Sequence, residues 1–381
     1  MNILLFSRGY PSSRDVQWGC FEKDQALALK KLGHNVVFIS IDGRFRFYYR
    51  KLGVTKIEDK DFIVYNLFLI PFAILKLFGK SFFLWYLRKM TFLLYARIEK
   101  EFTPDIIYAH YLTNIYAASV IKRKTGIPLV GIEHWSMLNR DVLSSFVKAM
   151  GEVAYQSVDS LISVSESLRQ RILSHFSKDS IVIHNMVNLD FKNRSVDNSF
   201  SPKRDFKIVS VGSLFYGKGY DVLINAFHKS KLYEKGSIIT IVGEGNERRN
   251  LEKQIKILGL QNNIFLVGQK NKNEIVEILL SSDLFVHPSR GENFSVAIIE
   301  GQAAGLPVIA TLCGGAMECI NKKNGLIVQI DDIDGLSEAM NYMYHHINEF
   351  NREEISRECL NKYSSSAIAK QINEILISVI K

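Results

Sequence analysis

Two carboxylates, Glu292 and Glu300, stand eight positions apart between His287 and Pro307. The apolar spacing of residues 295–304 predicts a helix, so Glu300 stands on a helix and Glu292 in the turn before it. At a rise of ~1.5 Å per helical residue, the two carboxylates are separated by roughly 10 to 12 Å. Carboxylates this far apart are poorly placed to share one proton or one metal ion.

Two carboxylates at this separation suit the hydroxyl groups at the two ends of an elongated polar ligand. The free N–H groups at the start of the helix, from Phe294 to Val296, would face an anion between them. A nucleoside diphosphate sugar has this order of groups: sugar hydroxyls, diphosphate and ribose hydroxyls. The alternative is a surface-loop Glu292 and an ordinary helical Glu300, and the spacing alone leaves both interpretations open.

Glycine-containing loops follow three predicted strands in the second half of the chain, at residues 212–219, 243–245 and 267–270. N–H groups in such loops can bind phosphate, and Lys218 adds a positive charge to the first loop. This loop is not a Walker loop, because its spacing differs and no Ser or Thr follows the lysine. Three such loops at successive strand ends, together with the turn at Glu292, predict a binding rim.

Short apolar segments alternate with helical periodicity in two successive series, which predicts an α/β fold. We expect two Rossmann-like doubly wound domains facing a cleft. The polar, irregular segment 191–204 predicts the boundary, which gives domains at 1–200 and 201–362. The amphipathic helix within 363–381 is expected to pack across the domain junction. The predicted strands are 2–7, 35–41, 62–70, 105–110, 128–132, 160–164, 180–183, 207–211, 238–242, 263–267, 284–287, 307–311 and 326–329.

The chain has 381 residues, 47% of them apolar, and a net charge of +9. The positive charge favours phosphorylated substrates or anionic lipids as partners. Nucleic acid is not expected, because lysines and arginines are spread along the chain without a basic helix or an aromatic-basic motif. Four scattered cysteines lack metal-ligand spacing and indicate reduced thiols, and no Asp-x-Asp metal motif occurs. The N-terminal residues predict a strand and not a signal peptide, so a cytoplasmic location is expected.

Residues 61–100 are the most apolar part of the chain, and residues 62–98 within them are rich in aromatic side chains. A proline and several polar residues interrupt the run, which argues against a membrane span. A helix is expected after the strand at 62–70, with Lys76, Lys80, Arg88 and Thr91 within about a third of its circumference. The wide apolar face that remains has two interpretations. It either packs in the core, or part of it and its lysines rest on an anionic membrane and serve a lipid-linked acceptor.

Two residues of the first half stand where the carboxyl ends of parallel strands are predicted, which is where open α/β sheets bind ligands. Gly19 ends a long loop after the first strand, and a glycine there would let a sugar or phosphate approach the backbone. His134 follows the strand 128–132 and titrates near neutrality. A turn glycine and a structural histidine remain the alternatives.

The second half of the chain combines a set of short motifs: the 212–219 loop with Lys218, Gly243-Glu-Gly245, Pro288-Ser-Arg-Gly-Glu-Asn-Phe294, Glu300, Ala304-Gly-Leu-Pro-Val308 and Gly314-Gly-Ala-Met-Glu318. Through these motifs it resembles the nucleotide-sugar-dependent, retaining group 1 glycosyltransferases of family 4, which have the GT-B fold. The first half matches that family more loosely, through Gly19, His134 and Asn185.

The resemblance implies an acceptor-side domain at 1–200 and a nucleotide-sugar donor domain at 201–362. It implies that Glu292 holds sugar hydroxyls, Glu300 ribose hydroxyls and Lys218 the diphosphate, with His134 beside the reacting sugar. His134, Glu292 and Lys218 are then the expected catalytic residues, and no metal or other cofactor is expected. The expected donor-binding residues are Gly19, Gly212, Ser213, Lys218, Gly243, Gly245, Arg290, Glu292, Asn293, Phe294, Ser295 and Glu300.

Three positions depart from the family pattern. Ser213 stands where the family usually has a second cation, an arginine, so a substitute such as Arg290 would be needed. Trp18-Gly19 replaces a Gly-Gly pair, and Asn188 replaces a frequent aspartate.

We therefore expect transfer of a sugar from a nucleoside diphosphate sugar to an acceptor hydroxyl, with retention. Cell-surface polysaccharide or lipid-linked oligosaccharide synthesis is the expected setting, with a peripheral position on the inner face of the membrane. The alternatives are a catalytically silent protein that binds a nucleotide sugar or a partner, and a nucleotide-sugar epimerase on the same fold.

Overall fold

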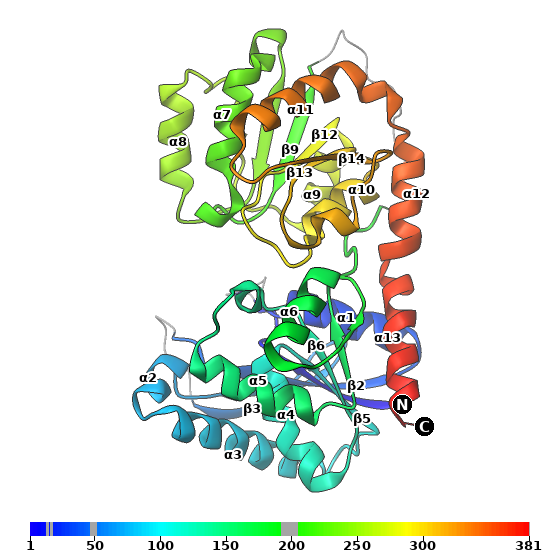
Figure 1. Cartoon of the computed structure of the whole chain (residues 1–381). Coiled ribbons are helices and arrows are strands. Elements are labelled where there is room, and N and C mark those ends of the chain that lie inside the picture. The colour runs from blue at the N-terminus through cyan, green and yellow to red at the C-terminus, as the bar shows by residue number, and fades with distance from the viewer. Residues whose placement is uncertain (13–14, 16–17, 46–51, 192–204, 381) are drawn as a thin grey trace. The chain divides into compact units, whose positions relative to one another are not determined.

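The computed structural model describes residues 1–12, 15, 18–45, 52–191 and 205–380. The chain forms two compact units (Figure 1): Met1–His184 with Ser365–Lys381, and Asn185–Ser364. The boundary expected at 200/201 lies outside the described residues. The C-terminal helix belongs to the first unit, where Nε2 of His34 lies 2.8 Å from Oδ1 of Asn373.

The first unit contains an eight-stranded sheet of order β3-β4-β2-β1-β5-β6-β7-β8. All neighbouring strands run parallel except the antiparallel pair β3 and β4. The central strands are buried on both faces, which explains their continuous apolar sequences. The strands are β1 (Asn2–Ser7), β2 (Asn35–Asp42), β3 (Gly53–Glu58), β4 (Ile63–Phe68), β5 (Ile106–His110), β6 (Leu129–Glu133), β7 (Ser160–Ser163) and β8 (Ile181–Val182).

Helices connect these strands, as parallel pairing requires. They are α1 (Cys20–Lys31), α2 (Phe72–Leu77), α3 (Lys80–Ile98), α4 (Leu112–Thr125), α5 (Ser145–Ser157), α6 (Glu166–Phe176) and α13 (Ser365–Ile380), with a 3-10 turn, η1, at Ser136–Asn139.

The single amphipathic helix expected after β4 is instead two helices, α2 and α3. Gly79 separates them with a φ of 89°, a backbone conformation that favours glycine. Thr91 does not share a polar face with the lysines, because it is buried and its hydroxyl donates to the carbonyl of Leu87. Part of α3 packs in the core, whereas Trp85 is exposed.

The second unit contains a six-stranded parallel sheet of order β11-β10-β9-β12-β13-β14. Its core is formed by apolar side chains of the strands together with those of α7, α8 and α11. The strands are β9 (Lys207–Val211), β10 (Ile238–Val242), β11 (Ile264–Leu266), β12 (Leu284–His287), β13 (Val308–Thr311) and β14 (Gly325–Val328). The helices are α7 (Tyr220–Ser230), α8 (Arg248–Ile257), α9 (Lys272–Leu280), α10 (Val296–Ala303), α11 (Ile333–His346) and α12 (Arg352–Tyr363).

The strand order of each sheet reverses at one point. In the second unit the chain adds β10 and β11 on one side of β9 and then places β12 on the other side. In the first unit β2 and β5 flank β1 in the same way. Ligands of open α/β sheets bind outside the carboxyl ends of the strands at such switch points. The loops after β9 and β12, and those after β1 and β5, are therefore the places to look for a site.

No helix among the described residues is long and apolar enough to cross a membrane.

Candidate functional site

The ammonium group of Lys218 forms an ion pair with the carboxylate of Glu292. Lys218 lies in the loop after β9 and Glu292 in the turn after β12, so the pair stands at the switch point of the second sheet. The Lys218 and Glu292 side chains are 29% and 18% exposed, respectively. The structure thus brings together two residues that the sequence placed 74 positions apart.

His287, the last residue of β12, is the third side chain of this cluster and lies next to Glu292. Its Nε2 atom lies 3.4 Å from Oε1 of Glu292. Burial acts to raise the pKa of Glu292, but the adjacent His287 and the charge of Lys218 outweigh it and lower the pKa to about 2. Glu292 is therefore ionised near neutral pH and acts as a hydrogen-bond acceptor.

The Arg290 guanidinium, the expected substitute for the second cation, binds two carboxylates of the same unit. It forms two hydrogen bonds with the carboxylate of Asp221, at 2.9 and 2.7 Å, and one with Asp331 at 2.6 Å. These carboxylates raise the pKa of Arg290 above its ordinary value. The backbone N–H of Arg290 also donates to the carbonyl of Gly217 at 2.8 Å. Arg290 therefore ties the turn after β12 to the loop after β9.

The glycine loops are held together by backbone hydrogen bonds. The N–H of Gly212 donates to the carbonyl of Val242 at 3.0 Å, and the N–H of Gly243 donates to Gly268 at 2.9 Å. These two N–H groups therefore bind neighbouring backbone carbonyls and are not available to a ligand. The N–H groups of Ser213 and Gly245 donate to no described residue, so they are the better placed of the four to meet a phosphate.

Residues 293–295 contribute mainly backbone to this edge of the sheet. Asn293 is buried and its carbonyl accepts a hydrogen bond from the N–H of Gly315 at 2.8 Å. The Phe294 ring is buried and lies 5.6 Å from the ring of Tyr363 on α12, so it belongs to the packing of the unit. Ser295 is the N-cap residue of α10, and Glu300 is half-buried within that helix.

In the first unit, His134 follows β6 and its ring stacks on that of His110, the last residue of β5. The ring centroids are 5.5 Å apart and the planes differ by 1°. The carboxylate of Glu133 accepts the backbone N–H groups of His134 and Trp135, both at 2.8 Å. Tyr155 donates its hydroxyl to the same carboxylate at 2.7 Å. A buried carboxylate thus fixes the backbone that carries His134.

His110 is fully buried, and neither ring nitrogen has a hydrogen-bond partner among the described residues. Burial, followed by the proximity of His134 and Arg8, holds the pKa of His110 well below its ordinary value. Neither His110 nor His287 was predicted as a site residue from the sequence. Like His134, each is a histidine at the carboxyl end of a parallel strand, and this pattern could have identified both.

Gly19 is the N-cap residue of α1, and the loop after β1 approaches it too closely for a side chain. A Cβ atom at Gly19 would lie 2.1 Å from the carbonyl oxygen of Gly9, and its φ is 84°. The neighbouring Trp18 donates its indole N–H to the carbonyl of Arg8 at 2.7 Å. The Arg8 guanidinium in turn lies 3.7 Å from the ring centroid of Tyr111. Gly19 therefore has a structural reason for being glycine whether or not a ligand approaches it.

Among the residues that the structure describes, no group of three His, Cys, Asp or Glu side chains is arranged to hold a metal ion.

Two family models match the chain in succession. The model of Glycosyltransferase Family 4 matches residues 23–191, and the model of Glycosyl transferases group 1 matches residues 191–352. The chain belongs to the group 1 glycosyltransferases of family 4. This glycosyltransferase has the GT-B fold, with two Rossmann-like α/β domains.

Relatives of this glycosyltransferase span most of its length. An uncharacterised glycosyltransferase of Methanocaldococcus jannaschii is 28% identical over 70% of this chain and 73% of its own length. The putative teichuronic acid biosynthesis glycosyltransferase TuaC of Bacillus subtilis is 26% identical over 91% of this chain and 90% of its own. The structure of Anabaena Alr3699/HepE in complex with UDP and glucose superposes with a TM-score of 0.73 at 17% identity, covering 99% of both chains.

Proposed function

We propose that this glycosyltransferase moves a sugar from a nucleoside diphosphate sugar to an acceptor hydroxyl with retention of the anomeric configuration. The proposed setting is the synthesis of a cell-surface polysaccharide or a lipid-linked oligosaccharide. The observation that carries the proposal is the Lys218–Glu292 pair at the switch point of the second sheet. A cation beside an ionised carboxylate suits a ligand that joins a diphosphate to a hydroxyl-rich sugar.

In the proposed reaction the bond between the sugar carbon C1 and the diphosphate oxygen breaks, and a bond from the acceptor oxygen to C1 forms on the same face. The acceptor proton ends on the departing diphosphate. Lys218 and free loop N–H groups stabilise the negative charge that develops there, without a protein-bound metal. Electrostatic stabilisation of this kind is expected to be the largest contribution to catalysis.

The remaining residues have proposed roles that follow from their positions. Glu292, ionised and anchored by Lys218, accepts hydrogen bonds from hydroxyls of the transferred sugar. Glu300 on α10 accepts those of the ribose. His134, held by the buried Glu133, lies beside the reacting sugar. The pathway and donor class are supported by relatives, since TuaC is named for teichuronic acid biosynthesis and Alr3699/HepE is named with UDP and glucose.

A catalytically silent protein that binds a nucleotide sugar is the second candidate. It is favoured by Ser213 at the family's arginine position and by the engagement of Arg290 with Asp221 and Asp331. Both features reduce the positive charge available to a diphosphate at this loop.

One experiment separates the two candidates. The purified protein is mixed with a panel of nucleotide sugars, and the donor is identified by the rise in melting temperature that its binding produces. Incubation of that donor with saccharide acceptors should then yield a glycosylated product with the donor's anomeric configuration, observed by proton NMR. Donor binding without any sugar product, across the acceptor panel, would support the silent protein and contradict transfer.

A further inference from the structure

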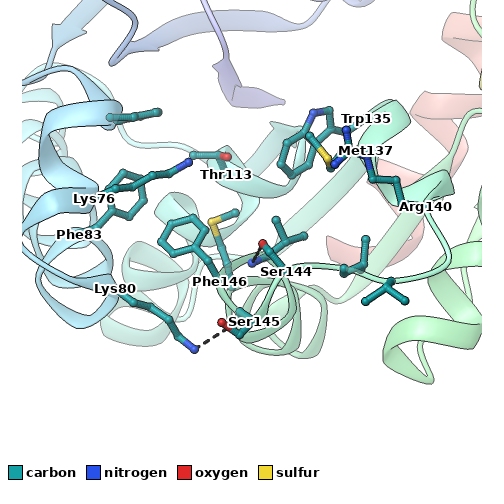
Figure 2. Close-up of a pocket in the computed structure, with 15 residues that line it drawn as sticks. Lys76, Lys80, Phe83, Thr113, Trp135, Met137, Arg140, Ser144, Ser145 and Phe146 are labelled. Carbon is teal, nitrogen blue, oxygen red and sulfur yellow. Dashed lines mark hydrogen bonds between the residues drawn. The ribbon is translucent and has the colours of Figure 1, made fainter.

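The first unit contains a cavity of about 550 Å³ at the carboxyl edge of its sheet. Its walls come from segments after β4, β5 and β6 and from the first turn of α5. Figure 2 shows Lys76 and Lys80 on one side of the cavity and Trp135, Met137 and Arg140 on the other. Trp135 directly follows His134, so the cavity adjoins the residue expected beside the reacting sugar.

The charged side chains that line the cavity are all cationic: Lys76, Lys80 and Arg140. Lys80 donates to the carbonyl of Ser145 at 3.2 Å, and the ammonium of Lys76 lies 5.1 Å from the ring centroid of Phe146. In the described parts of the chain, no carboxylate forms an ion pair with any of the three cations.

The nearest carboxylate in sequence, Asp141, is engaged elsewhere. It accepts a hydrogen bond from Arg171 at 2.8 Å and does not line the cavity. A concave site with three cations and no lining carboxylate selects an anionic group. The aromatic rings of Phe72, Phe83 and Phe146 contribute apolar surface to the lining, so the ligand is expected to carry apolar surface beside its charge.

An exposed apolar strip begins one residue after Lys76. Leu77 is 83% exposed and Phe78 is 67% exposed. The ring of Phe82 lies 5.6 Å from that of Phe78 and 5.7 Å from that of Trp85. The three exposed rings form a row from the end of α2 onto the start of α3. Exposed aromatic side chains beside lysines are typical of surfaces that contact lipid.

We infer that the cavity binds the phosphate of a lipid-linked acceptor, with the hydrocarbon chain lying along Phe78, Phe82 and Trp85. This inference rests on the proposed function and names its acceptor class. The three cations hold the phosphate at the carboxyl edge of the sheet, and the saccharide hydroxyl is thereby presented toward His134. A neutral saccharide acceptor would bring no negative charge to the three cations.

Binding of farnesyl phosphate to the full chain, measured by isothermal titration calorimetry, tests the inference. The double variant Lys76→Gln/Arg140→Gln should weaken binding by about 100-fold, because each of the two lost charge-assisted hydrogen bonds costs about tenfold. The matched control is Lys148→Gln, an exposed lysine of α5 that does not line the cavity and should leave binding unchanged. The double variant Phe78→Ser/Phe82→Ser should also weaken binding, and inorganic phosphate alone should bind far more weakly than farnesyl phosphate.

Three outcomes would overturn the inference. The first is equal affinity of the wild type and Lys76→Gln/Arg140→Gln for farnesyl phosphate. The second is a loss of affinity in Lys148→Gln as large as that in the double variant, which would indicate unspecific attraction to positive charge. The third is binding to vesicles of phosphatidylglycerol without binding to farnesyl phosphate, which would show a membrane contact instead of an acceptor site.

The melting-temperature shift with the identified nucleotide sugar is measured on the same variants. If the wild type shows that shift but the cavity variants bind farnesyl phosphate normally, only the acceptor inference fails; if no nucleotide sugar binds, the proposed function fails.

Discussion

Lys218 and Glu292 form an ion pair although they are carried by loops after two different strands. The pairing of β9 with β12 brings these loops together at the point where the strand order reverses. In the proposed donor site, a diphosphate shares Lys218 with Glu292. By this proposal the ion pair holds the lysine in place before the donor binds, which lowers the entropy cost of binding.

Replacing Lys218 by alanine should reduce kcat/KM by about 100- to 1000-fold, because it removes a cation from the position where charge develops on the leaving diphosphate. Steady-state release of nucleoside diphosphate measures the effect. Lys229→Ala is the matched control, because Lys229 is exposed and forms an ion pair with Asp334. A loss confined to KM, with kcat unchanged, would mean that Lys218 stabilises the bound donor and the transition state equally.

Replacing Arg290 by glutamine should lower the melting temperature while leaving the affinity for the nucleoside diphosphate within about twofold. The Arg290 guanidinium binds Asp221 and Asp331 and so connects two loops, which means that its loss should affect stability more than donor binding. The loss of such charged hydrogen bonds typically costs about 1 to 3 kcal/mol. Thermal unfolding and calorimetric titration measure the two quantities on one sample. A large loss of affinity with an unchanged melting temperature would instead show that Arg290 turns toward the diphosphate when the donor binds.

Much of the fold was predictable, because buried parallel strands carry continuous apolar runs that stand out locally. The bounds of β9, β10 and β12 agree with those predicted from sequence. β3 was not predicted, since its residues lie on a sheet edge where Lys56 and Glu58 interrupt any apolar pattern. The break between α2 and α3 was also missed, because helical periodicity continues past Gly79 and only the backbone conformation of that glycine reveals the break.

The site was predicted less completely than the fold. Glu292 and Lys218 were each identified, but their ion pair depends on the adjacency of β9 and β12, which no local pattern encodes. The position of Arg290 depends on Asp221 and Asp331 in the same way. Residue type and strand-end position thus identify candidate residues, whereas their partners depend on the strand order.

Replacing Glu300 by alanine should weaken donor binding by about tenfold, since the proposed ribose contact is a charge-assisted hydrogen bond. Calorimetric titration with the identified nucleotide sugar measures it. Glu358→Ala on α12, an exposed glutamate, is the matched control. Unchanged donor affinity in Glu300→Ala would remove Glu300 from the donor site.

Replacing Gly314 by alanine should destabilise the second unit and displace Glu292. A Cβ atom there would lie 1.6 Å from the carbonyl oxygen of Glu292, and the φ of 47° is unfavourable for alanine. Forced backbone movement of this kind costs on the order of 1 to 3 kcal/mol. Gly291→Ala is the control for stability, because a Cβ atom at Gly291 would meet no atom within 4 Å. Urea unfolding compares the two variants, and equal stabilities would contradict the close approach.

The buried His110 should make the stability of the protein depend on pH below neutrality. Its folded pKa lies well below the ordinary 6.5, so the unfolded chain binds the proton more readily. The contribution of His110 is therefore fully present above about pH 6.5 and is lost as the pH falls, by up to about 1.4 kcal/mol per pH unit. His110→Phe keeps a ring against His134 but removes the titrating group. Urea unfolding of both proteins between pH 7.5 and 5 should show a steeper loss of stability in the wild type. Parallel curves would mean that the pKa of His110 is the same in the folded and the unfolded chain.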